Sequence, residues 1–228
     1  MKKTFFKLGL FLALGLTIVV FNSCEKDDDT DGGINDGTAS KITATNVING
    51  TAQIITVKAL ADFDGGDDDD SSDAIAQAPY QNNGFTLELP ATLGAKYLTL
   101  DTDGLYGISV SDRNVKFTDL NGFEGYNEDD VQIGYFVLEE EKNDSDHHAV
   151  WIYVDRDVTI KGEVNEVDKE SATNDKYIYD LTLNKGWNNV YEISTDSYEN
   201  DINVYSTTMT SNKPSGVNYT WRFYDDGF

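Results

Sequence analysis

Seven aspartates crowd the segment 62–73, and carboxylates at this density are the ligands that hard cations prefer. They are Asp62, Asp64, Asp67, Asp68, Asp69, Asp70 and Asp73. A bound Ca²⁺ would relieve the mutual repulsion of these carboxylates, and Gly65 and Gly66 would let the backbone turn tightly around it. The spacing is not that of an EF-hand, because Gly66 stands where a ligand should be. We expect no required cofactor, with Ca²⁺ as the candidate ion and a solvated run of charge as the alternative.

The two histidines of the chain, His147 and His148, are adjacent in the polar segment 143–148. On a strand they would point to opposite faces, so they supply at most part of a metal site. No other histidine could activate a serine or cysteine nucleophile, and the G-x-S-x-G elbow and glycine-rich phosphate loops are absent from the sequence. We therefore expect a protein that is not an enzyme and has no catalytic residues. A carboxylate-based glycan hydrolase is the alternative, because the separation of two carboxylates cannot be read from a sequence.

Aromatic side chains are the other candidates for contact with a ligand. Trp151 and Trp221 stand in apolar segments and are expected in the core. The core is the default expectation for Trp187 as well, but it stands beside two asparagines at the start of a predicted strand, so it is the tryptophan that we consider as a candidate at the rim of a binding surface. Tyr126 and Tyr198 are placed at predicted loop tips, where a tyrosine is a rigid contact group. These three residues are the candidate ligand-binding side chains.

The N-terminal segment 1–23 has the layout of an export signal. Three lysines form a positive end, and an apolar run of 14 residues, 8–21, follows them. This run is shorter than the roughly 20 residues that span a bilayer. The one cysteine of the chain, Cys24, comes directly after the small residue Ser23, where cleavage would make it the new N-terminus.

The sequence around Cys24 resembles the signal peptide and lipobox of bacterial lipoproteins. The residues that follow resemble the acidic export signal of Bacteroidota-type surface lipoproteins: Glu25, Lys26, Asp27, Asp28 and Asp29. These resemblances imply that Cys24 carries lipid, that this lipid is the contact with the outer membrane, and that the protein faces the cell exterior. Residues 24–40 are rich in Asp, Gly and Thr, and we expect them to form an acidic flexible tether.

From residue 41 onward the hydrophobic pattern has a period of two, which is typical of half-buried strands. Phe85, Leu87 and Leu89 are one example, and Asn-Gly and Asp-Gly turns separate such segments. No window keeps the spacing of an amphipathic helix over several turns. The sequence predicts an all-β ectodomain over 41–228, with about ten to twelve strands arranged as an antiparallel β-sandwich.

The two parts of this ectodomain have different patterns. Residues 41–100 resemble a small transthyretin-like or Ig-like sandwich, whereas residues from about 105 to 228 are predicted to form a meander of strands. An up-and-down barrel is the alternative for the C-terminal part. We expect a single domain, with a sub-boundary near 101–112 as the alternative.

The charge balance narrows the classes of partner. The chain has 17 Lys and Arg against 41 Asp and Glu, a net charge of −24 and an isoelectric point near 4.1. Such a polyanion repels phosphates, so nucleic acids are excluded as partners. The whole layout resembles the uncharacterised β-rich surface lipoproteins of Bacteroidota. We expect a non-catalytic cell-surface lipoprotein that acts as a binding or adhesion module for a glycan, a protein or a partner lipoprotein.

Overall fold

The structure, a computed structural model, describes residues 40–63, 71–99, 107–120, 122–142, 145–168, 172–199 and 202–225. In these ranges nearly all regular structure is strand, and the helical element is a single 3₁₀ turn, Ala95–Tyr97. The predicted all-β fold is confirmed. No helix within the same ranges is long enough and apolar enough to cross a membrane.

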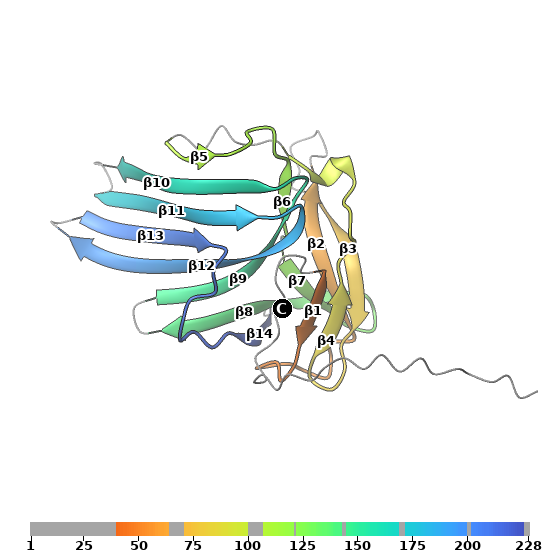
Figure 1. Cartoon of the computed structure of the whole chain (residues 1–228). Coiled ribbons are helices and arrows are strands. Elements are labelled where there is room, and N and C mark those ends of the chain that lie inside the picture. The colour runs from red at the N-terminus through yellow and green to blue at the C-terminus, as the bar shows by residue number, and fades with distance from the viewer. Residues whose placement is uncertain are drawn as a thin grey trace, which may run out of the picture. The chain divides into compact units, whose positions relative to one another are not determined.

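Twelve strands form one continuous sheet (Figure 1). Ten of the twelve follow one another in hydrogen-bonded order: β3 (Ser71–Pro79), β2 (Thr56–Phe63), β7 (Gly122–Tyr126), β8 (Gln132–Lys142), β9 (Ser145–Val154), β12 (Gly186–Glu199), β13 (Ile202–Thr210), β11 (Thr173–Leu183), β10 (Val158–Asp168) and β5 (Ser109–Val110). The remaining two of the twelve strands pair with strands in the middle of this order. β14 (Thr220–Asp225) pairs with β8, and β6 (Phe117–Asp119) pairs with β9.

A second, two-stranded antiparallel sheet consists of β1 (Lys41–Ala44) and β4 (Phe85–Glu88). Alternate residues of both strands are buried, as the period of two requires, and they include Phe85 and Leu87. These side chains pack in the main core, where the Phe85 ring lies 5.3 Å from the ring of Trp221 on β14. Two sheets therefore pack face to face around this core, although the second sheet has only two strands.

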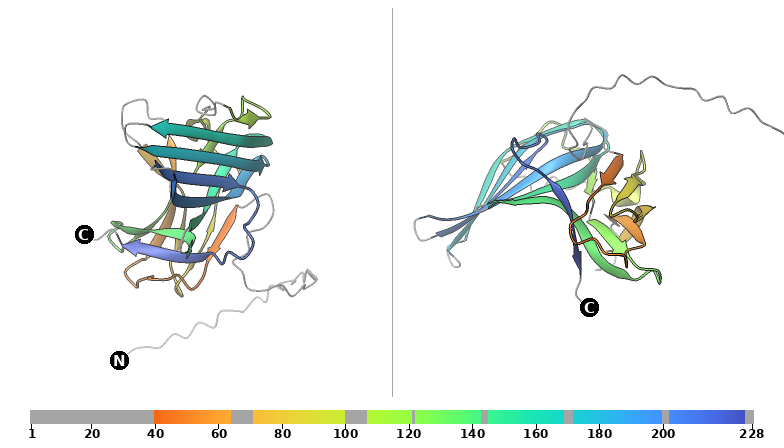
Figure 2. Two further views of the ribbon diagram at one scale, coloured as in Figure 1. Left: turned by 90° about the vertical axis from the view of Figure 1, so that its left-hand side faces the viewer. Right: turned by 90° about the horizontal axis from the view of Figure 1, so that it is seen from below.

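The large sheet curls into a half-barrel on its β9 to β5 side (Figure 2). β5 pairs with β10 near one edge of the curl, whereas β6 pairs with β9 on the other side. The connection 111–116 between β5 and β6 therefore runs from β10 to β9 and covers one end of one face. We call this the inner face; it carries Val158, Leu181 and Val190, which pack with Val115 of the connection.

The strand order differs from the predicted meander. β12 pairs with β9, and β13 lies between β12 and β11, so that β11 and β13 run parallel. Every other pair of named strands is antiparallel. The reason is that alternation marks where strands lie and which side chains share a face, but it does not specify which distant strand is the neighbour.

Candidate functional site

The inner face holds an apolar pit next to the covered end of the curl. Buried residues from β9, β10, β11 and the β5–β6 connection line it: Val154, Val158, Leu181, Leu183 and Val115. They do not fill the space, and a cavity of about 240 Å³ opens between them, with Phe117, Ile152, Ile160, Tyr179 and Met209 on its walls and Asp119 as its one charged lining residue among the described side chains. Pockets that hold whole small-molecule ligands usually measure roughly 300–1,000 Å³. The pit suits a single apolar group.

Three exposed tyrosines continue the inner face away from the pit. Strand register places Tyr177 of β11, Tyr205 of β13 and Tyr198 of β12 on the same face as the pit residues. Their exposed fractions are 36% for Tyr177, 44% for Tyr205 and 67% for Tyr198. Large exposed aromatic groups on one side of neighbouring strands form a rigid contact surface.

Carboxylates share this face with the tyrosines. Register places Glu166 of β10, Asp175 of β11, and Glu192 and Asp196 of β12 on the inner face. None of these four makes an ion pair with another described residue. No Lys or Arg occupies an inner-face position among the described side chains of β10 to β13. This part of the inner face is therefore purely anionic.

The opposite, outer face of the same strands has its charges paired. Lys161 on β10 lies 2.7 Å from the carboxylate of Asp180 on β11, and Lys176 on β11 lies 3.1 Å from Glu163 on β10. On β10 to β12, the outer-face carboxylates Glu163 and Asp180 have cationic partners, whereas the four inner-face carboxylates have none among the residues that the structure describes, so the two faces differ in local charge. On these strands the inner face is therefore the candidate site for a cationic or hydrogen-bonding ligand.

Tyr179 lines the pit and lies on β11 between the buried Leu181 and the exposed Tyr177. Burial raises the pKa of its phenol, and the neighbouring Tyr177 and Glu166 raise it further. Glu166 lies farther along β10 on the same face, with three residues between it and Gly162, the register partner of Tyr179. Tyr179 therefore keeps its proton near neutral pH and can donate a hydrogen bond at the mouth of the pit.

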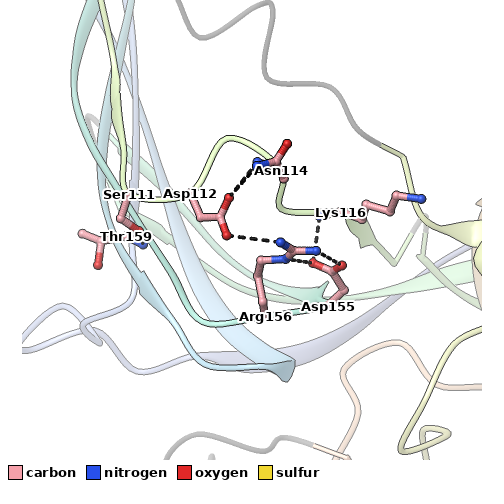
Figure 3. Close-up of polar contacts among 7 residues, drawn as sticks. All are labelled: Ser111, Asp112, Asn114, Lys116, Asp155, Arg156 and Thr159. Carbon is pink, nitrogen blue, oxygen red and sulfur yellow. Dashed lines mark hydrogen bonds and ion pairs between the residues drawn. The ribbon is translucent and has the colours of Figure 1, made fainter.

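Arg156 fixes the connection that covers the end of the inner face (Figure 3). Its guanidinium donates two hydrogen bonds of 3.0 Å to Asp155 and one of 3.2 Å to Asp112 in the connection. Asp155 also accepts the backbone N–H of Lys116, from the other end of the connection, at 2.9 Å. The connection is therefore fastened at both ends to the turn that follows β9.

Because of this network, we expect the stability of the protein to depend on pH through Asp112. The backbone N–H of Asn114 and the Arg156 guanidinium both lower the pKa of Asp112 below its ordinary value of 3.8. A carboxyl whose pKa falls on folding stabilises the protein above its ordinary pKa, and this contribution is lost as the pH falls through the lowered value. Asp112→Asn should therefore unfold at lower urea concentration than the wild type at pH 7, and the difference should shrink below about pH 4.

Urea unfolding at pH 7 and pH 3 measures this effect. Asp129→Asn is the matched control for the loss of one negative charge, since Asp129 is exposed in the turn before β8 and makes no ion pair among the described residues. An Asp112→Asn deficit that is equal at both pH values would contradict the role given to this ionised carboxylate.

A buried carboxylate lies on β8 beside the inner face. Glu139 is 6% exposed; its Oε1 accepts a hydrogen bond of 2.8 Å from Nε of Arg222 and another from the hydroxyl of Tyr224, both on β14. Its Oε2 lies 3.5 Å from Nε2 of His148 on β9. A second hollow, of about 370 Å³, is lined nearby by residues that include His148 and Glu124. Because both oxygens of Glu139 already have partners, the cluster ties β14 and β9 to β8.

The aromatic predictions have mixed outcomes. Trp151 and Trp221 are buried and stack at 5.8 Å, so their prediction as core residues is confirmed. Trp187 lies in the core, the default expectation, and its candidate position at a rim is wrong: the residue is only 2% exposed, its ring packs edge-on against Tyr153, and its indole N–H donates to the carbonyl of Pro90 at 2.9 Å. The Pro90 segment covers this end of β12, which the local sequence does not reveal.

Neither of the two candidate tyrosines lies on a loop. Tyr126 is the last residue of β7; its ring lies under the ammonium of Lys58, 3.7 Å from the centroid, and its hydroxyl donates to Glu124. Burial, then Glu124, raises its pKa. Tyr198 belongs to β12 and is among the exposed tyrosines of the inner face. The structure therefore groups Tyr198 with Tyr177 and Tyr205, and places Tyr126 and Trp187 elsewhere.

The predicted cation ligands are only partly described. Asp62 lies on β2, whereas Asp64, Asp67, Asp68, Asp69 and Asp70 lie outside the described residues. Asp73, on β3, accepts hydrogen bonds from Lys96 and Tyr97, which lower its pKa. In the described part of the chain, no three His, Cys, Asp or Glu side chains are grouped as a metal site.

The remaining predicted positions divide between strands and the undescribed N-terminal segment. His147 and His148 lie on β9, with His147 buried and bonded to Ser145 at 3.0 Å, and they point to opposite faces as predicted for a strand. Cys24 and the residues of the predicted export signal, Glu25, Lys26, Asp27, Asp28 and Asp29, lie outside the described residues.

Sequence reasoning missed most of the inner-face residues, although a signal for them is present. Tyr177, Tyr179, Leu181 and Leu183 stand at every second position along one segment, and a period of two by itself predicts that all four share one buried face. Asp175 continues the same alternation toward the start of the strand. When one face of a strand changes from leucine to tyrosine to aspartate, its leucine end is expected to be buried in a core and its aspartate end to be exposed to solvent.

Comparisons of this chain with protein-family models, with curated proteins and with solved structures find no match.

Proposed function

We propose that this protein is a non-catalytic binding module that takes its ligand on the inner face of the half-barrel. The observation that supports this most strongly is the composition of that face: a largely apolar pit, three exposed tyrosines and four carboxylates that have no cationic partner in the described part of the chain, all on neighbouring strands. Binding surfaces combine aromatic anchors with polar groups that still have hydrogen-bonding capacity. A glycan, a protein or a partner lipoprotein remain the ligand classes.

The proposed place of action is the cell surface. A lipid on Cys24 would anchor the protein in the outer membrane, and the predominantly acidic segment Glu25 to Asp29 would direct it to the exterior. Each buried methylene of an acyl chain contributes about 0.8 kcal/mol, so a set of acyl chains is sufficient as an anchor. The acidic tether 24–40 would then hold the binding module away from the membrane.

A binding assay with face-specific variants tests the proposed function. The full chain is applied to a glycan array and to an array of peptides, together with the double variant Tyr177→Ser/Tyr205→Ser. Loss of two aromatic anchors should weaken binding to every true ligand by roughly tenfold or more. The control is Val167→Ser/Val204→Ser, which changes two apolar residues on the outer face of β10 and β13 and should bind as the wild type does. Ligands bound equally by all three proteins would contradict the proposal.

A further inference from the structure

We propose that the inner face recognises a basic polypeptide segment, with one apolar side chain in the pit and a Lys or Arg side chain among the tyrosines and carboxylates beyond it. This inference rests on the proposed function and deepens it, because it names the class of ligand. Three independent features support it: the like-charge arrangement of the face, the position of Tyr205, and the size and spacing of the pit.

Like charges oppose each other directly on this face. Glu166 of β10 is the register partner of Asp175 of β11, and both side chains lie on the inner face. Like charges at directly opposed positions of a strand pair are destabilising, and no described Lys or Arg on the inner face of these strands offsets the cost. A cationic ligand would remove this repulsion, so its binding gains free energy that a neutral ligand does not gain.

Tyr205 lies between two of these carboxylates. Its register partners are Asp175 on β11 and Asp196 on β12, so that an aromatic ring is flanked on both neighbouring strands by an acid. A guanidinium or ammonium above a tyrosine ring is attracted by the ring, and carboxylates beside the ring add to the attraction. Tyr205 is 44% exposed, so its ring is accessible to such a group.

The pit and the anionic surface have a defined spacing. Tyr179 and Met209 stand at the pit, and Asp175 and Tyr205 stand four residues away on the same two strands. At about 3.3 Å per residue, the separation is about 13 Å, which an extended peptide covers with about four residues. A pit of about 240 Å³ takes one side chain, whereas the open surface beyond it accommodates a continuing chain. These dimensions favour a polypeptide over a small molecule.

Fluorescence anisotropy with the full chain and synthetic peptides tests the inference. The probe is a fluorescent Gly/Ser peptide with one Phe and two Arg, the first Arg four residues after the Phe. Asp175→Asn/Asp196→Asn should weaken binding of this peptide by roughly 5- to 20-fold at low salt. The matched control, Glu163→Gln/Asp180→Asn, makes the same change in net charge on the outer face of β10 and β11 and should alter binding by less than about twofold.

Changes in the probe test the two recognition elements separately. A peptide with Glu in place of Arg should not bind, and a peptide with Ser in place of Phe should bind roughly tenfold more weakly. Equal weakening by both charge variants would overturn the inference, because attraction by net charge alone would then explain the binding. Urea unfolding of each variant shows whether it is folded; relief of like-charge repulsion should leave Asp175→Asn/Asp196→Asn at least as stable as the wild type.

The outcome also separates this inference from the proposed function. If no basic peptide binds while a glycan or another ligand still depends on Tyr177 and Tyr205, the inference is wrong and the proposed function stands. If no ligand of any class depends on these tyrosines, both are wrong.

Discussion

Trp187→Ala should lower the free energy of unfolding by about 3–5 kcal/mol, the range for removal of a large buried aromatic side chain. The side chain is among the most completely buried of the described residues, and it packs against Tyr153 from the neighbouring β9. Its indole N–H also donates to the carbonyl of Pro90, which lies 97 residues earlier in the chain. The alanine variant loses the packing and leaves this carbonyl without the indole donor.

Urea unfolding followed by circular dichroism measures this effect, and two further variants divide it. Trp187→Phe keeps an aromatic ring but removes the N–H donor, and it should cost less than the alanine variant. Tyr198→Ala, on the same strand but 67% exposed, should change stability by no more than about 0.5 kcal/mol. If Trp187→Ala were as stable as Tyr198→Ala, Trp187 would be a surface residue and its original prediction as a rim contact would be restored.

Cys24→Ala should abolish the proposed lipid attachment, because a thioether bond to the lipid would require the sulfur of the one cysteine in the chain. Incorporation of labelled palmitate measures this directly, and phase separation in detergent measures the loss of the anchor. Ser23→Ala is the matched control, since it changes the neighbouring residue but keeps a small side chain and the cysteine. Undiminished palmitate labelling of Cys24→Ala would rule out lipidation at this site.

The acidic residues after Cys24 allow anchoring to be separated from the side of the membrane. A triple variant with Asp27, Asp28 and Asp29 replaced by Ala should still incorporate palmitate, since Cys24 is intact. It should lose accessibility to protease added to intact cells, since the proposed export signal is removed. Equal protease accessibility of the triple variant and the wild type would show that these residues have no role in export.

The amino-acid sequence by itself determined the class of fold and much of the main core. A hydrophobic period of two leaves one face of each segment apolar, and that face must be buried against another sheet or loop. Phe85, Leu87, Trp151 and Trp221 are buried for this reason, and each could be assigned from its immediate neighbours in the chain. The local pattern is sufficient to predict burial wherever many apolar residues are available to cover the apolar face.

Only the tertiary structure decided where the candidate site lies. Leu181 and Tyr177 occupy the same face of β11, yet Leu181 is buried and Tyr177 is exposed, because the 111–116 connection packs over one end of that face only. Trp187 is buried for a similar reason, since Pro90 and its neighbours come from far away in the chain. Tyr205 is likewise adjacent to Asp175 and Asp196 only because β13 lies between β11 and β12. Contacts between segments distant in sequence carry no local periodicity, so alternation alone could not place them.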